Sequence, residues 1–75
     1  MNRLERLQQA HPFLSEEKAR LLFVLAYQVG HHDSLIDHHG LSTDEWMEIC
    51  LSQFQGMEHD DIKNLVAQAE EYTCA

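Results

Sequence analysis

Histidine offers more chemistry than any other side chain in this sequence. Six histidines occur among 75 residues, and four of them stand close together with two aspartates between them. The residues of this group are His31, His32, Asp33, Asp37, His38 and His39. Imidazole and carboxylate groups are good ligands for zinc, nickel, copper and iron. One hypothesis is therefore a transition-metal-binding protein that uses the segment 31–39.

The spacing of these residues differs from that of established zinc motifs. The paired-cysteine and histidine spacings of structural zinc sites do not occur here, and neither does the H-E-x-x-H pattern of zinc proteases. An exposed polar loop is the simpler interpretation of the segment 31–39. We therefore expect no required cofactor, and we expect a bound zinc or nickel ion to be adventitious. Because histidine titrates near pH ~6.5, a pH-sensing role is a further hypothesis.

The other reactive side chains lack the sequence context of an enzyme. Cys50, Ser34 and Ser42 are the candidate nucleophiles, and no glycine-rich phosphate loop accompanies them. Ser42 is better explained as a helix cap, and Cys50 falls in an apolar helical stretch where we expect it to be buried. The other cysteine, Cys74, stands next to the C-terminus. We therefore expect no catalytic activity.

Charge is distributed unevenly along the chain. The formal net charge is -8, from 13 Asp and Glu against 5 Lys and Arg. Residues 1–20 hold four cations and three carboxylates, whereas residues 21–75 hold a single lysine and ten carboxylates. Such a surface repels phosphate backbones, so we expect no direct binding to nucleic acid. It suits a basic protein partner. Alternatively, the acidic surface could compete with nucleic acid, as in a phage- or plasmid-type inhibitor.

Helices must position these groups, and the first two are well marked. Residues 2–10 form an amphipathic pattern that should end before Pro12, because the residue before a proline disfavours the helical conformation. Ser15 is a good N-cap for a second helix over about 15–29, whose middle is an unbroken apolar run. Gly30 predicts the end of that helix, as a left-handed residue beyond the last turn.

Two further helices follow towards the C-terminus. Ser42 and Glu45 match the S-x-x-E capping box, which predicts a helix start just after Ser42. That helix should end at Gly56. Apolar residues then recur with helical spacing over about 58–72.

These elements predict an all-α fold, a compact four-helix bundle with orthogonal or up-down geometry. The 75 residues form one small helical domain, with the apolar helix 15–29 at its centre and a C-terminal helical hairpin over about 43–72. The residues expected in the core are Leu21, Leu22, Leu25, Trp46, Ile49, Cys50, Phe54, Ile62, Leu65 and Val66.

The sequence favours a small acidic interaction protein, an adaptor, regulator or inhibitor with no catalytic activity of its own. The candidate partner-binding residues lie in the last two helices: Glu48, Asp60, Asp61, Glu70 and Glu71. Self-association through the second helix, giving a homodimer, is a companion hypothesis. No window approaches the ~18 consecutive apolar residues of a membrane span, and residues 1–13 do not resemble a secretory signal. We therefore expect a cytoplasmic protein with no membrane partner.

Overall fold

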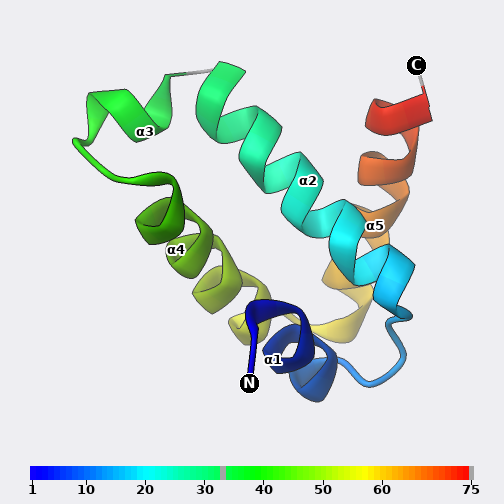
Figure 1. Ribbon diagram of the computed structural model, residues 1–75. Coiled ribbons are helices and arrows are strands. Elements are labelled where there is room, and N and C mark those ends of the chain that lie inside the picture. Colours follow the sequence, from blue (N-terminus) through cyan, green and yellow to red (C-terminus); the bar gives the residue numbers. More distant parts are fainter. Residues whose placement is uncertain (33, 75) are drawn as a thin grey trace.

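The computed structural model describes residues 1–32 and 34–74, with side chains through Tyr72. The described residues form five helices and no strand, which confirms the all-α prediction (Figure 1). The helices are α1 (Arg3–Ala10), α2 (Glu16–His32), α3 (Leu35–His38), α4 (Thr43–Gly56) and α5 (His59–Cys74). The single turn α3 is the element that separates this fold from a four-helix arrangement.

Side-chain caps begin the helices as the sequence predicts. The Ser42 hydroxyl accepts a hydrogen bond from the Glu45 backbone N–H at 3.1 Å, and the Glu45 carboxylate accepts one from the Ser42 N–H at 3.1 Å. This reciprocal pair is the predicted capping box. The Ser15 hydroxyl likewise accepts from the Lys18 N–H at 3.2 Å. Local polar chemistry therefore sets where α2 and α4 begin.

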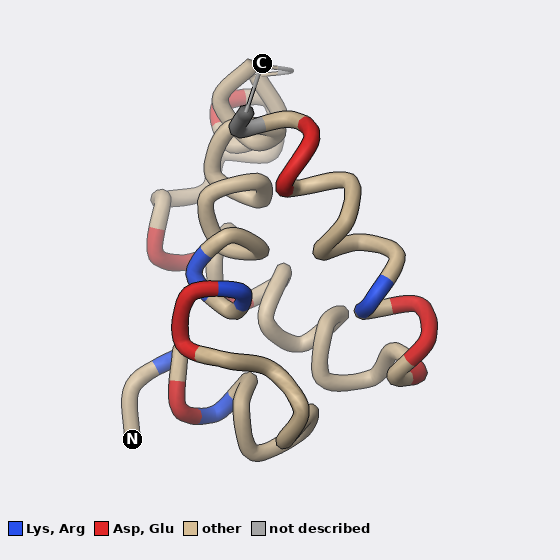
Figure 2. Tube along the Cα trace, turned by 90° about the vertical axis from the view of Figure 1, so that its right-hand side faces the viewer, with Lys and Arg blue, Asp and Glu red and all other residues tan. Residues whose placement is uncertain are grey.

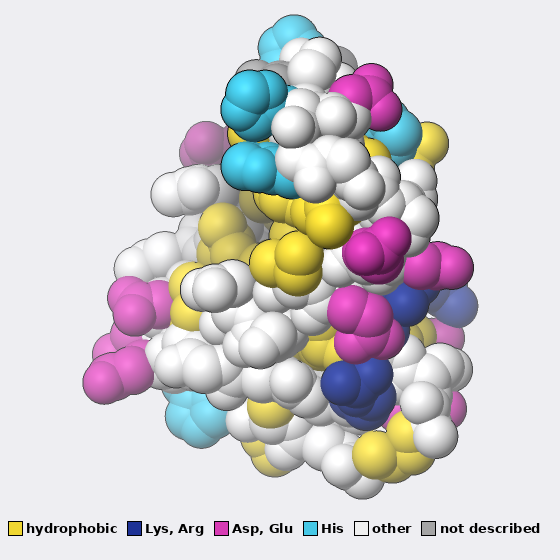
Figure 3. Space-filling view, turned by 90° about the vertical axis from the view of Figure 1, so that its left-hand side faces the viewer, with side chains coloured by type: hydrophobic (Ala, Val, Ile, Leu, Met, Phe, Trp, Pro, Cys, Tyr) yellow, Lys and Arg dark blue, Asp and Glu magenta, His cyan; other side chains and the backbone are white. Residues whose placement is uncertain are grey.

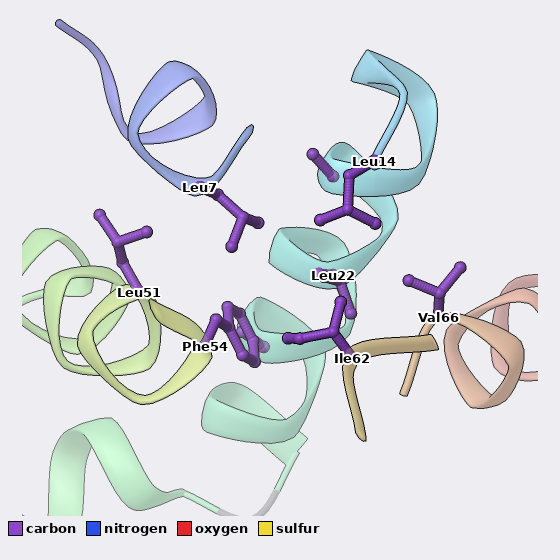
Figure 4. Packing of buried hydrophobic residues seen from close by; sticks show 9 residues of the cluster. Leu7, Leu14, Leu22, Leu51, Phe54, Ile62 and Val66 are labelled. Atoms are coloured by element: carbon purple, nitrogen blue, oxygen red, sulfur yellow. The ribbon is translucent and has the colours of Figure 1, made fainter. Parts of the chain in front are cut away.

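Helix α2 lies at the centre of the molecule and packs against each of the other four helices. Its Leu22 is fully buried and belongs to a cluster drawn from all the long helices (Figure 4). The cluster residues labelled there are Leu7, Leu14, Leu22, Leu51, Phe54, Ile62 and Val66. Four of these were predicted. Leu7 and Leu14 were not, because α1 and the connection after it cover more of the core than their short apolar patterns indicate, and Leu51 was not, because it faces inward on α4 where Ile49 was expected to.

The rest of the predicted core is less buried. Five residues are half-buried: Leu21, Leu25, Trp46, Cys50 and Leu65. The prediction for Ile49 was wrong, because its side chain is 44% exposed. Leu51 takes the inward position on α4 instead and is fully buried. A stripe that is apolar over more than half of a helix does not by itself say which edge faces inward.

Gly30 does not end α2, contrary to the prediction. The helix continues through this glycine to His32, and Gly30 is buried. A β-carbon at this position would lie 2.5 Å from Nε1 of Trp46. The indole N–H of Trp46 donates a hydrogen bond to the Ala26 carbonyl at 2.8 Å. Gly30 therefore serves close packing of α4 on α2, and the glycine with a positive φ is Gly40.

The predicted C-terminal hairpin was wrong. Helices α4 and α5 meet near their junction, where Phe54 and Ile62 share the core cluster, and then diverge on either side of α2 (Figure 1). Helix α5 packs mainly on α2, whereas α4 packs on both α1 and α2. The apolar side of α5 therefore packs against α2 rather than against α4, the helix that precedes it in sequence. No helix in the described part of the chain is long and apolar enough to cross a membrane.

Candidate functional site

The histidine-rich segment is divided between separate elements. His31 and His32 belong to the last turn of α2, and His38 ends α3. Asp37 belongs to α3 and His39 follows it, whereas Asp33 lies outside the described residues. The described members are all exposed. On the face shown in Figure 3, histidine side chains gather at one end of the molecule beside exposed apolar groups.

Three of the described histidines of this segment, His31, His38 and His39, make contacts with neighbouring rings. The imidazole of His31 lies against the Tyr27 ring, with the centroids 4.3 Å apart. The rings of His38 and His39 meet edge to face at 5.0 Å. Within the described ranges, no three His, Cys, Asp or Glu side chains come together in an arrangement that could hold a metal ion. The predicted ligand set is therefore not assembled among the described residues.

A different pair of histidines is assembled by the fold. His11 follows α1 and is 2% exposed, and its Nδ1 lies 2.7 Å from Nδ1 of His59 at the start of α5. The other ring nitrogen of His11, Nε2, lies 2.7 Å from the Phe54 carbonyl oxygen. Because a carbonyl only accepts, Nε2 must carry the proton and donate it. In the tautomer with the proton on Nε2, His11 accepts at Nδ1, and His59 then donates its Nδ1–H to it.

Aromatic and charged groups surround this pair. The Phe13 ring meets the imidazoles of His11 and His59 edge to face, at centroid distances of 6.0 and 5.3 Å. The Lys63 ammonium lies 5.3 Å above the Phe13 ring centroid. An open hollow of about 470 Å³ adjoins the pair and is lined by Ala10, His11, Gln55, Met57, Glu58, His59 and Asp60. The pair thus joins the end of α1, the end of α4 and the start of α5.

Sequence reasoning missed this pair because its members are 48 positions apart. No spacing rule connects two histidines at that separation. The one local signal is the position of His11 before Pro12 and Phe13. The helix ends there, and the backbone carbonyl groups of its last turn need hydrogen-bond donors from outside the helix. In the structure the His11 backbone N–H donates to the Leu7 carbonyl at 3.0 Å, and this bond holds the residue at the end of α1 while its imidazole lies inside.

The predicted partner-binding carboxylates fall into two groups. Glu48 on α4 accepts hydrogen bonds from Arg3 at 3.3 Å and from Arg6 at 3.1 Å, and Asp44 accepts one from Arg3 at 3.0 Å. The hydrogen bond to Asp44 raises the pKa of Arg3 further above its ordinary value. Glu48 therefore joins α1 to α4 within the molecule.

The remaining predicted carboxylates lie on α5. Asp60 and Asp61 are exposed in its first turn, and Glu70 and Glu71 are exposed near its other end. Figure 2 shows these acidic positions at both ends of α5, with Lys63 close to the first pair. The structure thus keeps four of the five residues on one helix and places Glu48 on a different element.

None of the three candidate nucleophiles, Ser42, Cys50 and Ser34, has the surroundings of an activated nucleophile in the part of the chain that the structure describes. The Ser42 hydroxyl is occupied by the α4 cap. Cys50 is half-buried, and this burial raises the pKa of its thiol. A thiol with a raised pKa carries less thiolate at neutral pH and is a weaker nucleophile. Ser34, which precedes α3, is exposed with φ of 57°.

No protein-family model, curated protein or solved structure matches this chain. Its function must therefore be argued from its own residues. Two features stand out chemically: the His11–His59 pair, which joins three elements, and the exposed carboxylates of α5.

Proposed function

We propose that this chain is an acidic protein–protein interaction module that binds a basic partner protein through the outward face of α5. This helix carries four carboxylates and one lysine. The partner is expected to bring lysine or arginine side chains to Asp60, Asp61, Glu70 and Glu71. We place the module in the cytoplasm, in an adaptor, regulator or inhibitor role without catalysis of its own.

The observation that carries this proposal is the internal pairing of the arginines. Arg3 and Arg6 on α1 are bound by the α4 carboxylates Asp44 and Glu48, and Arg20 pairs with Glu16 at 2.7 Å. These three arginines therefore have carboxylate partners outside α5. The net negative charge therefore lies mostly on carboxylates that these arginines do not contact. Helix α5 holds four of those carboxylates and one lysine. Such a field speeds the association of oppositely charged partners and falls with ionic strength.

An exposed aromatic residue supports the same face. Tyr72 near the end of α5 is 48% exposed, and it lies eleven positions, about three helical turns, after Asp61, so it shares a side of the helix with that carboxylate. Tyrosine is enriched among the residues that contribute most to binding energy at protein interfaces. Carboxylates for orientation and a tyrosine for apolar contact together suit a protein partner.

A pair of charge-matched variants tests this proposal. Asp60→Asn with Glu71→Gln removes two charges from α5, and Glu5→Gln with Asp37→Asn removes two exposed charges elsewhere. Partners captured from cells by the wild-type chain are identified, and the dissociation constant of the leading partner is measured for each variant. We expect the α5 variant to bind about tenfold more weakly and the control variant to bind nearly as the wild type does.

Two outcomes would contradict the proposal. Equal weakening by both variants would show that only overall charge matters. Capture of nothing beyond non-specific basic proteins, with no dependence on Asp60 or Glu71, would remove the dedicated partner altogether.

A further inference from the structure

Helix α2 carries an exposed row of side chains on the face opposite its buried residues. The buried positions of this helix are Ala19, Leu22, Ala26 and Gly30. The exposed row consists of Glu17, Arg20, Val24, Tyr27 and His31. Its steps of three, four, three and four residues match the seam of a coiled coil, in which such a row packs against a second helix. Val24 and Tyr27 are 41% and 48% exposed, so the middle of the row is apolar and open.

A hollow runs along each side of this row. The hollow on the α4 side has a volume of about 390 Å³ and is lined by Arg20, Phe23, Val24, Tyr27, Gln28 and Met47. The hollow on the α5 side has a volume of about 460 Å³ and is lined by Glu17, Lys18, Arg20, Leu21, Val24 and Glu70. A ridge between two grooves is the surface that a second helix can pack against with interlocking side chains.

We propose that this face is a homodimer interface in which two α2 helices pair in antiparallel orientation about a two-fold axis beside Val24. A two-fold interface brings the same patch of both copies together, so the patch must complement itself. In this arrangement a residue before Val24 meets a residue equally far after Val24 in the second copy. This inference does not depend on the partner proposed for α5.

The polar and aromatic groups along the row are complementary in that arrangement. Glu17 lies seven positions before Val24 and His31 lies seven after it, so each Glu17 carboxylate meets an imidazole of the other copy. Arg20 lies four positions before Val24 and Tyr27 three after it, and both line the same hollow. The long arginine side chain spans the difference of one position, so each guanidinium can lie against a tyrosine ring of the other copy. A guanidinium over an aromatic face is attractive.

The alternative orientation is disfavoured by the same residues. A parallel pair would place Glu17 against Glu17, Arg20 against Arg20 and His31 against His31. Like groups in direct contact across a helix pair destabilise it. The antiparallel arrangement also sets the two helix dipoles in opposition, which favours association. The row is therefore complementary to itself in one orientation, and this selects a second copy of the chain as its occupant.

Sedimentation of the full chain tests the dimer. We expect the wild-type chain, of 8.7 kDa, to double in mass as its concentration rises from about 10 to about 500 µM. Val24→Asp places two carboxylates at the axis and should weaken the dimer by about 50-fold. Ile49→Asp is the matched control, since Ile49 is 44% exposed on α4 and does not line either hollow; it should leave the dimer within about threefold of the wild type.

A charge exchange tests the orientation. His31→Glu should weaken the dimer by about tenfold, because it places two carboxylates together, and Glu17→Lys should also weaken it, because the imidazole loses the carboxylate that accepts its N–H. The chain with both substitutions should recover to near wild-type association, since Lys at position 17 and Glu at position 31 would bring opposite charges together across the two copies. Circular dichroism of every variant checks that the monomer stays helical.

Three results would overturn the dimer proposal. They are a wild-type chain that stays monomeric at about 500 µM, a Val24→Asp chain that dimerises as the wild type does, and a double variant that does not recover. Each of these results leaves the α5 partner proposal standing, because that proposal is tested by Asp60 and Glu71.

Discussion

Two groups of histidines behave in opposite ways in this molecule. The histidines of the segment 31–39 are neighbours in sequence, yet the fold leaves them exposed on two different helices and the residue that follows. His11 and His59 are 48 positions apart, yet their Nδ1 atoms lie 2.7 Å from each other. Closeness in sequence gathers residue types, whereas tertiary packing decides which side chains meet.

The reason lies in which residues face the interior. At the end of α2, Gly30 faces inward and Trp46 packs against it, so His31 and His32 are turned outward. At the end of α1, the fully buried Leu7 anchors the helix on the core, and the next position facing the same way is His11. A histidine at i+4 from a core leucine is carried inside with it.

The largest expected effect in this comparison comes from His11. His11→Ala removes a buried ring with hydrogen bonds to Phe54 and His59. It should lower the free energy of unfolding by about 2 to 4 kcal/mol, because a cavity remains and the hydrogen bonds of His11 to Phe54 and His59 are lost, although the Phe54 carbonyl still accepts from the Met57 N–H. Urea denaturation followed by circular dichroism measures this change.

The matched control is His38→Ala on the exposed side of the comparison. His38 is exposed and its ring lies against the neighbouring ring of His39, so the free energy of unfolding should change by less than about 0.5 kcal/mol. Equal losses at the two positions would contradict the distinction between the buried pair and the exposed segment.

The second largest effect on stability is expected at Gly30, which packs against Trp46 next to His31 and His32. Gly30→Ala gains about 1 kcal/mol in helix propensity but forces the Trp46 indole to move, so we expect a net loss of about 1 to 3 kcal/mol in urea denaturation. Gly56→Ala is the control, because a β-carbon there meets no atom within 4 Å. A Gly30→Ala chain as stable as the Gly56→Ala chain would show that the contact with Trp46 does not hold α2 and α4 together.

Sequence reasoning recovered the helices far better than it recovered their partners. The boundary at Ser42 was predictable because a capping box lies within four residues. The role of Gly30 was not, because a glycine that ends a helix and one that admits a tryptophan look the same in sequence. The outward position of Ile49 was equally hidden, since Leu51 and Ile49 both fit the apolar side of α4.

The candidate sites divide in the same way. Asp60, Asp61, Glu70 and Glu71 could be placed on one helix, because they are close in sequence. The pairing of Glu48 with Arg3 and Arg6 could not, because it depends on how α1 crosses α4. The same limit hid His11 and His59, whose contact depends on the ends of three helices meeting.

A smaller effect is expected at the exposed partner of the pair. His59→Ala removes one donor to His11 and should cost about 1 kcal/mol in unfolding free energy, less than His11→Ala. Nitrogen NMR of the wild-type chain should show His11 protonated at Nε2 and bare at Nδ1. In the His11→Ala background, the cost of His59→Ala should fall towards zero. An undiminished cost in that background would contradict coupling between the two rings.

The smallest effect is expected from zinc on the histidine-rich segment. Zinc stabilises a folded chain according to its concentration relative to the dissociation constant, and a tight site needs three or four ligands held together. The described residues bring no such set together, so zinc at about 100 µM should raise the free energy of unfolding by less than about 0.5 kcal/mol. A chain with His31, His32, His38 and His39 all replaced by glutamine should respond in the same way. A rise of about 2.7 kcal/mol in the wild type that disappears in this variant would mean a dissociation constant near one-hundredth of the zinc concentration. That result would contradict the contrast between the two groups of histidines. It would mean that zinc brings the exposed histidines of the segment 31–39 together, as packing brings His11 and His59 together.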